Sequence, residues 1–256
     1  MAAVVKEVEI GDSKVPGVFE EEKYLPIVSI QLVFKNSGHL SNTKDGLADM
    51  SARLMNEGTS KEGSVGFATK LDAHAVEIGA HVGRESFAIE VSSLKSEFDY
   101  AVERLEELLK DPNYTQAALD HIKHQKIVWL TRKKSDFDYI AGTTLRATLF
   151  KGSVLARPYD GTIESIKKIS LEDIQTFLST HLGYNNVIGV VGGDVTFDEA
   201  QGYLKRLLAL FPKVEEKKDL RIQASNKKEV VFKDEDTHQA YIYFGAPFNY
   251  SYKEKD

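Results

Sequence analysis

The chain has 256 residues, with 33 lysines and arginines, 39 aspartates and glutamates, and no cysteine. This length allows one large domain or nearly two. The absence of cysteine excludes disulfides, cysteine-ligated metal sites and thiol catalysis, and a net charge of −6 argues against a dedicated nucleic-acid binder. Apolar runs fall far short of the roughly 20 residues that span a bilayer. The composition therefore indicates a soluble globular protein.

The N-terminal part of the chain is predicted to be rich in strands. Alternating sequence predicts a strand at residues 4–10, and β-branched sequence predicts one at 14–21. The apolar run at residues 25–34 predicts a long, largely buried strand. An antiparallel pair is expected at residues 76–82 and 85–91. Apolar residues at helical spacing predict helices at residues 45–56 and 64–73, and Gly58 is placed to end the first of them.

The remainder of the chain is predicted to be mainly helical. Helices are expected at residues 97–109, 138–150, 170–182 and 196–211, with one buried strand at residues 186–192. Thr115 is expected to be the N-cap of a long helix that runs to about residue 133. Ser170 and Asp173 have the spacing of a capping box. Grouped strands and successive helices favour an α+β fold, in which a mixed, mostly antiparallel sheet packs against a layer of helices.

The C-terminal sequence repeats a pattern seen near the N-terminus. Residues 228–244 are expected to form a short strand, an acidic turn and a longer strand, as residues 15–34 do, and a shift of 213 residues aligns Phe19 with Phe232. The sequence therefore predicts a first domain at residues 1–212, a charged linker at 213–227 and the start of a second homologous domain at 228–256.

A series of short motifs runs through the chain in order. Gly46-Leu-Ala precedes a helix and Gly58-Thr59 follows it; Asp111-Pro-Asn-Tyr, Pro158-Tyr and the Val-Val-Gly-Gly-Asp of residues 190–194 come later. Together they resemble the pitrilysin-like inverted-zincin metallopeptidases, a family that includes the mitochondrial processing peptidase subunits and the bc1 core subunits. The resemblance implies the metallopeptidase-like domain fold of that family.

The residues that carry catalysis in the family are replaced here. Active members have H-x-x-E-H after the Gly-Leu-Ala segment: two histidines on one helical face bind zinc, the glutamate activates water, and a later glutamate is the third ligand. The resemblance aligns these positions with Asp49, Ala52, Arg53 and a residue at or next to Trp129. Alanine cannot accept a proton and a guanidinium repels zinc. The sequence thus predicts no catalytic residue, no metal and no other cofactor.

Two arrangements of charged or metal-ligating side chains need an interpretation. Asp49 and Arg53 are four residues apart, with the acid N-terminal to the base, so we expect an ion pair in place of the metal; an unimportant solvated pair is the alternative. His121 and His124 have a spacing compatible with a weak metal site, but Lys123 and Lys126 oppose a cation, and a solvated helix face is favoured.

One strand is expected to bind peptides without catalysis. The resemblance implies that a substrate peptide adds as a further strand to the sheet edge at residues 76–82, through backbone groups that do not depend on the side chains. Edge strands also occur without this function, so both interpretations stay open. The predicted peptide-binding residues are Val76, Glu77, Ile78, Gly79, Ala80, His81 and Val82.

The resemblance also implies a role for the whole protein. It predicts the non-catalytic, substrate-binding or regulatory subunit of a processing-protease-type heterodimer, whose partner carries an intact H-x-x-E-H; extended peptides are the other expected ligands. Two alternatives are a structural scaffold subunit of a larger assembly and an active metallopeptidase with a non-standard site. A bacterial source is expected, and the sequence leaves periplasm and cytoplasm equally open.

Overall fold

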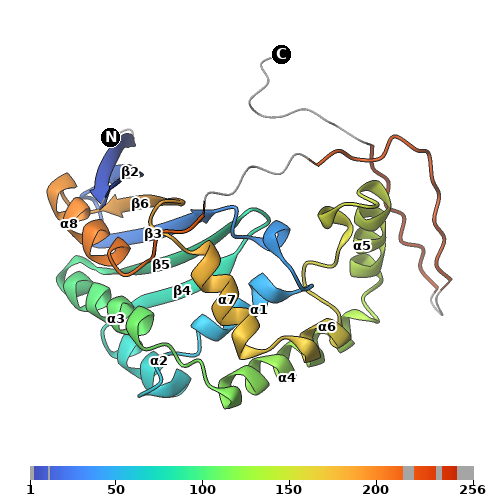
Figure 1. Cartoon of the computed structure of the whole chain (residues 1–256), viewed down its shortest axis with the longest axis horizontal. Coiled ribbons are helices and arrows are strands. Elements are labelled where there is room, and N and C mark those ends of the chain that lie inside the picture. Colours follow the sequence, from blue (N-terminus) through green and yellow to red (C-terminus); the bar gives the residue numbers. More distant parts are fainter. Residues whose placement is uncertain (1–2, 11, 216–221, 235–237, 247–256) are drawn as a thin grey trace.

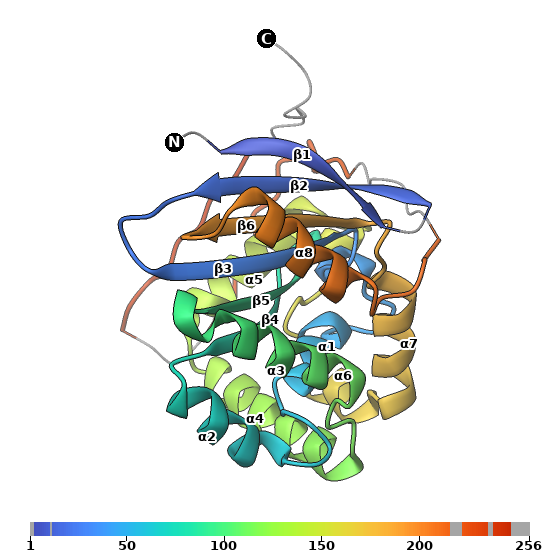
Figure 2. The ribbon, with the colours of Figure 1, turned by 90° about the vertical axis from the view of Figure 1, so that its left-hand side faces the viewer.

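The computed structural model describes residues 3–10, 12–215, 222–234 and 238–246. Its six-stranded sheet has the order β1-β2-β6-β3-β5-β4 (Figure 2). The β2/β6 pair is parallel and the other four neighbouring pairs are antiparallel. The strands are β1 (Val4–Ile10), β2 (Ser13–Glu21), β3 (Ile27–Lys35), β4 (Glu77–Val82), β5 (Ser86–Leu94) and β6 (Val187–Gly193). The predicted mixed, mostly antiparallel α+β fold is confirmed.

The helices follow most of the predicted ranges. They are α1 (Leu47–Met55), α2 (Gly63–Ala73), α3 (Phe98–Lys110), α4 (Gln116–Lys133), α5 (Phe137–Leu149), α6 (Ile163–Lys168), α7 (Leu171–His181) and α8 (Phe197–Leu208). Sequence analysis missed α6, because its six residues are too few to show a helical period, although Thr162 and Ser165 form a capping box at its start. The predicted N-caps Thr115 and Ser170 are confirmed.

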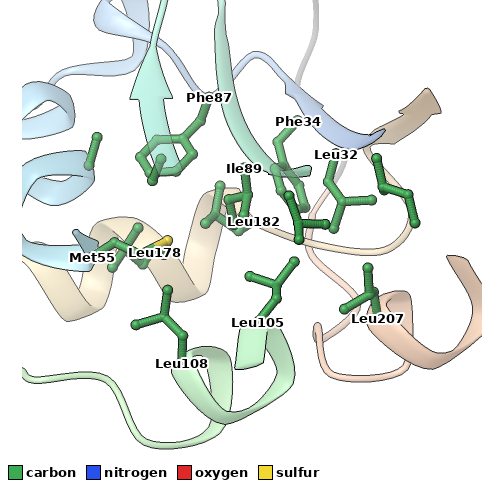
Figure 3. Packing of buried hydrophobic residues seen from close by; sticks show 14 of the residues in the cluster. Leu32, Phe34, Met55, Phe87, Ile89, Leu105, Leu108, Leu178, Leu182 and Leu207 are labelled. Atoms are coloured by element: carbon green, nitrogen blue, oxygen red, sulfur yellow. The ribbon is translucent and has the colours of Figure 1, made fainter. Parts of the chain in front are cut away.

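The core lies between the sheet and the helices α1, α3, α7 and α8 (Figures 1 and 3). Alternate residues of β3 and β5 point into it because successive side chains of a strand face opposite ways. Figure 3 shows side chains from these two strands meeting leucines of the helices. The inner face of α1 therefore packs against the sheet in the shared core.

The C-terminal segment differs from its prediction. Residues 222–234 and 238–246 form no helix or strand, so the two strands expected at 228–244 are absent from these ranges; the centre of the expected turn lies outside the described residues. The segment runs along α5 instead (Figure 1), where Tyr243 Oη donates to Asp138 Oδ1 over 2.7 Å. A hairpin cannot bury its apolar face without further partners. The predicted domain boundaries stay a prediction.

Candidate functional site: a charged cluster between α1 and α4

Helix α1 holds the three positions that the resemblance aligns with H-x-x-E-H. Arg53 Nε donates to Asp49 Oδ2 over 2.9 Å, so the expected i, i+4 ion pair is confirmed. Ala52 is buried beside this pair and presents only a methyl group. The first and second ligand positions therefore share one face of α1, and each is occupied by a side chain whose charge the other neutralises.

A lysine that the sequence analysis did not select completes the cluster. Lys126 of α4 is 1% exposed, and its Nζ lies 3.0 Å from Asp49 Oδ2 and 3.0 Å from Asp160 Oδ1. A buried ammonium loses its hydration, and this cost is offset only by well-placed acceptors. The two carboxylates supply them. Lys126 and Arg53 thus both contact the carboxylate at the first ligand position.

Two glycines bring Asp160 to the start of α1. Gly46 and Gly161 have φ values of +86° and +77°, which glycine adopts without strain. A Cβ atom on Gly46 would lie 3.1 Å from Gly161 Cα, so the two turns pack backbone against backbone. Arg157 Nε donates to Asp45 Oδ1 over 2.6 Å and holds the turns together. Asp160 is consequently fixed opposite Asp49, with Lys126 between them.

Two aromatic side chains, Trp129 and Tyr139, contact Lys126 and its partner Asp160. The Trp129 ring centroid lies 4.4 Å from Lys126 Nζ, a cation–π contact. Tyr139 Oη donates to Asp160 Oδ2 over 3.3 Å. Burial, together with the charge of Asp160, raises the pKa of Tyr139 to about 12, so this hydroxyl remains a donor at neutral pH. Sequence analysis placed the third ligand at or next to Trp129; the α4 side chain that reaches Asp49 is Lys126, one turn earlier.

The donor set at this site does not fit a zinc ion. Zinc needs deprotonated nitrogen, sulfur or oxygen ligands and an open approach. Here Asp49 is the single acid on α1, and an ammonium and a guanidinium lie against it. Within the described ranges, no three histidine, cysteine, aspartate or glutamate side chains are grouped so that they could hold a metal. Ala52 also leaves the base position without a proton acceptor.

The remaining candidates lie away from this cluster. His121 and His124 are on the exposed side of α4, where His121 Nε2 contacts Gln125 Nε2 at 2.9 Å. The strand proposed for peptide binding, β4, is an edge strand next to α1; it begins at Glu77, so Val76 precedes it. No helix in the described part of the chain combines the length and apolar character needed to cross a bilayer.

A half-buried histidine near the cluster predicts a dependence of stability on pH. His39 stacks on Tyr159 with ring centroids 5.2 Å apart, and burial lowers the pKa of its imidazole. The unfolded chain therefore binds a proton near pH 6.5 while the folded chain does not. Stability from this group is present above pH 6.5 and is lost as the pH falls below it. His39→Phe should flatten the fall in melting temperature between pH 7 and pH 5.

The matched control is His81→Phe, because His81 is exposed on β4 and 3.7 Å from Glu90. It should leave the slope of melting temperature against pH close to that of the parent chain. An equal change of slope in both variants would contradict the assignment to His39.

Comparison with known proteins supplies the family. Residues 18–162 match the family described as "Insulinase (Peptidase family M16)", and residues 168–256 match "Peptidase M16 inactive domain". The chain belongs to peptidase family M16. The M16 inactive domain from Pseudomonas fluorescens has a similar structure, with a TM-score of 0.78 and 19% identity, covering 86% of this chain and 54% of that one. The periplasmic protease PqqL from Escherichia coli gives a TM-score of 0.73 at 15% identity, covering 88% of this chain and 26% of that one.

Two curated relatives in the M16 family differ in what their names say of activity. "Non-peptidase homolog YmxG" of Helicobacter pylori is 39% identical over 96% of this chain and 57% of its own length. The human "Mitochondrial-processing peptidase subunit beta" is 20% identical over 71% of this chain and 37% of its own length. This M16 chain therefore spans little more than half of the first relative and less of the second.

Proposed function

We propose that this chain belongs to a non-catalytic M16 protein that pairs with a catalytic M16 subunit and holds extended peptides for it. The observation that carries the first part is the contact of Lys126 and Arg53 with Asp49, next to the methyl group of Ala52. An ammonium and a guanidinium lie where the family holds its metal, and the side chain at the base position, Ala52, cannot accept a proton. The name of the H. pylori relative, a non-peptidase homologue, supports the same proposal.

The peptide-binding part rests on the position of β4. This strand is an edge strand of the sheet and lies beside α1 (Figure 1), the helix that carries Asp49 and Arg53. Backbone hydrogen bonds along a sheet edge bind extended peptides in many proteins. The seven residues from Val76 to Val82 remain the proposed binding edge. Periplasm and cytoplasm both remain proposed locations.

Pairing with a catalytic chain predicts a concentration-dependent gain of activity. The full-length protein, mixed with an M16 chain that has H-x-x-E-H, should form a complex of one copy each, measured by light scattering after gel filtration. Peptide cleavage by the partner should rise at least tenfold. Two monomers with unchanged cleavage would contradict the pairing. Stoichiometric zinc with cleavage by this protein alone would contradict the non-catalytic assignment and favour an active enzyme with a non-standard site.

A scaffold role is the second candidate, and one surface favours it. Tyr24, Leu25, Ile27 and Leu94 are exposed, and Ile27 pairs with Leu94 across β3 and β5. Exposed apolar side chains that gather on one surface mark interaction sites in many proteins. The worm relative named "Cytochrome b-c1 complex subunit 1, mitochondrial" is 23% identical over 70% of this chain and 38% of its own length. Leu25→Lys should abolish assembly in this case while leaving peptide affinity unchanged.

A further inference from the structure

The free edge of β4 is partly occupied by a side chain of the same molecule. Asn56, the residue at the C-terminal end of α1, donates from Nδ2 to the carbonyl oxygen of Ala80 over 2.9 Å. The Ala80 N–H donates back to Asn56 Oδ1 over 2.8 Å. One carboxamide therefore satisfies both backbone groups of the residue near the middle of the edge strand.

This pair of hydrogen bonds has the pattern of a neighbouring strand. In an antiparallel sheet, directly opposed residues exchange both N–H and C=O bonds at alternate positions. Ala80 is opposite Ile89 in the β4/β5 register, and its bonds to Asn56 show that its polar groups point away from β5. Ile78 and Val82, two residues away on either side, share this direction. A peptide adding to β4 would need the groups of Ala80 at the centre of this run.

We propose that Asn56 competes with extended peptides for the edge of β4 and so determines how tightly this chain holds them. The inference rests on the proposed peptide-binding function and adds the residue that regulates it. The carboxamide imitates one residue of an incoming strand. A peptide must displace it from Ala80 or leave that position unpaired.

The position of Asn56 makes such a displacement physically accessible. Asn56 is exposed to solvent, although Ala80 is buried, so the side chain can rotate outward into water without opening the core. Its backbone is fixed independently, because its N–H bonds to carbonyl groups of the last turn of α1. The carboxamide of Asn56 can therefore leave Ala80 while the backbone of Asn56 stays hydrogen-bonded to α1.

Removing the competitor should strengthen peptide binding. Each of the two hydrogen bonds that the peptide has to replace has a modest net value, so we expect Asn56→Ala to lower the Kd about tenfold. Asn56→Asp keeps an acceptor for the Ala80 N–H but places a carboxylate against the Ala80 oxygen. It should give an intermediate gain and, being close in shape, it tests the proposal if the alanine variant folds poorly.

The experiment measures fluorescence anisotropy of a labelled decapeptide of alternating alanine and threonine, blocked at both ends, with the full chain and each variant. Asn113→Ala is the matched control, because Asn113 Nδ2 donates to the Glu57 oxygen, next to Asn56 but away from β4. Its Kd should equal that of the parent chain. Amide exchange at Ala80 should accelerate in Asn56→Ala and not in Asn113→Ala, which shows that the edge has been uncovered.

The outcomes separate the competitor from the binding edge. The proposal is supported if Asn56→Ala binds the peptide most tightly, Asn56→Asp less tightly and the parent chain least tightly. Equal peptide affinity in all three overturns the role of Asn56 and leaves peptide binding intact. Failure of all variants to bind the peptide, with Ala80 exchanging rapidly in Asn56→Ala, overturns the peptide-binding function itself.

Discussion

Lys126→Met should destabilise the fold by about 3 kcal/mol, near the lower end of the range for removing one partner of a buried ion pair. Methionine is close in size to lysine and can keep the contact with the Trp129 ring, so the loss comes from charge rather than from a cavity. Without the ammonium, Asp49 keeps its bond to Arg53, and among the described residues Asp160 keeps the hydrogen bond from the Tyr139 hydroxyl alone. The free energy of unfolding in urea at neutral pH measures this loss.

Two comparisons isolate the charge of Lys126. Lys123→Met, three residues earlier on α4, removes a half-exposed ammonium that contacts the Lys167 carbonyl oxygen, and should cost under about 1 kcal/mol. In the Asp160→Asn background, Lys126→Met should cost at least about 1 kcal/mol less than in the parent chain, because contacting residues are energetically coupled. An equal cost in both backgrounds would show that packing, and not the ion pair, stabilises this position.

The sequence predicted those helices and strands whose signals lie within a few neighbouring residues. Thr115 and Ser170 are recognisable as N-caps because a side-chain oxygen that binds a nearby N–H acts within one turn. The strand at β3 was likewise predicted from its apolar, β-branched sequence. The expectation that it is largely buried was wrong, because only alternate residues of β3 are buried. Helix α6 could not be predicted, since six residues stabilised by contacts with distant segments show no period of their own.

For the C-terminal segment, the sequence predicted two strands that the described residues do not form. Residues 228–244 have a sequence suited to strands, but a strand exists only when another strand pairs with it. In the described ranges this segment pairs with none and contacts α5 instead. The sequence pattern shows that a segment can form a strand. Whether it does so depends on a neighbouring strand with which it can pair.

In the candidate site, too, a local contact could be predicted from the sequence and a long-range contact could not. The Asp49–Arg53 pair could be predicted because residues four apart on a helix are neighbours. Lys126 could not be placed opposite Asp49, because that contact joins residues 77 positions apart in the chain and depends on Gly46 and Gly161 bringing two turns together. One signal was present: Lys126 occupies a position in the apolar stripe of α4 that includes Ile122 and Leu130. A lysine at such a position indicates a buried acceptor.

Restoring the ligands should create a zinc site, and the structure selects which α4 position to change. Asp49→His, Ala52→Glu and Arg53→His rebuild H-x-x-E-H on α1. Adding Lys126→Glu places a carboxylate on the α4 side chain that already reaches residue 49, and glutamate is shorter than lysine, which leaves room for an ion. The variant with all four substitutions should retain stoichiometric zinc after dialysis. At a free zinc concentration 100 times the Kd, it should gain about 2.7 kcal/mol of stability.

The matched variant carries the same three changes on α1 with Trp129→Glu in place of Lys126→Glu. It keeps the Lys126 ammonium beside the rebuilt ligands, where it repels a divalent cation, so we expect it to lose zinc on dialysis and to show no zinc-dependent rise in melting temperature. The reverse result, zinc held by the Trp129 variant alone, would move the third ligand position to Trp129. Failure of both would show that α1 and α4 are not spaced for a shared metal. Only the first outcome is compatible with a site in which Lys126 stands where the family has its glutamate.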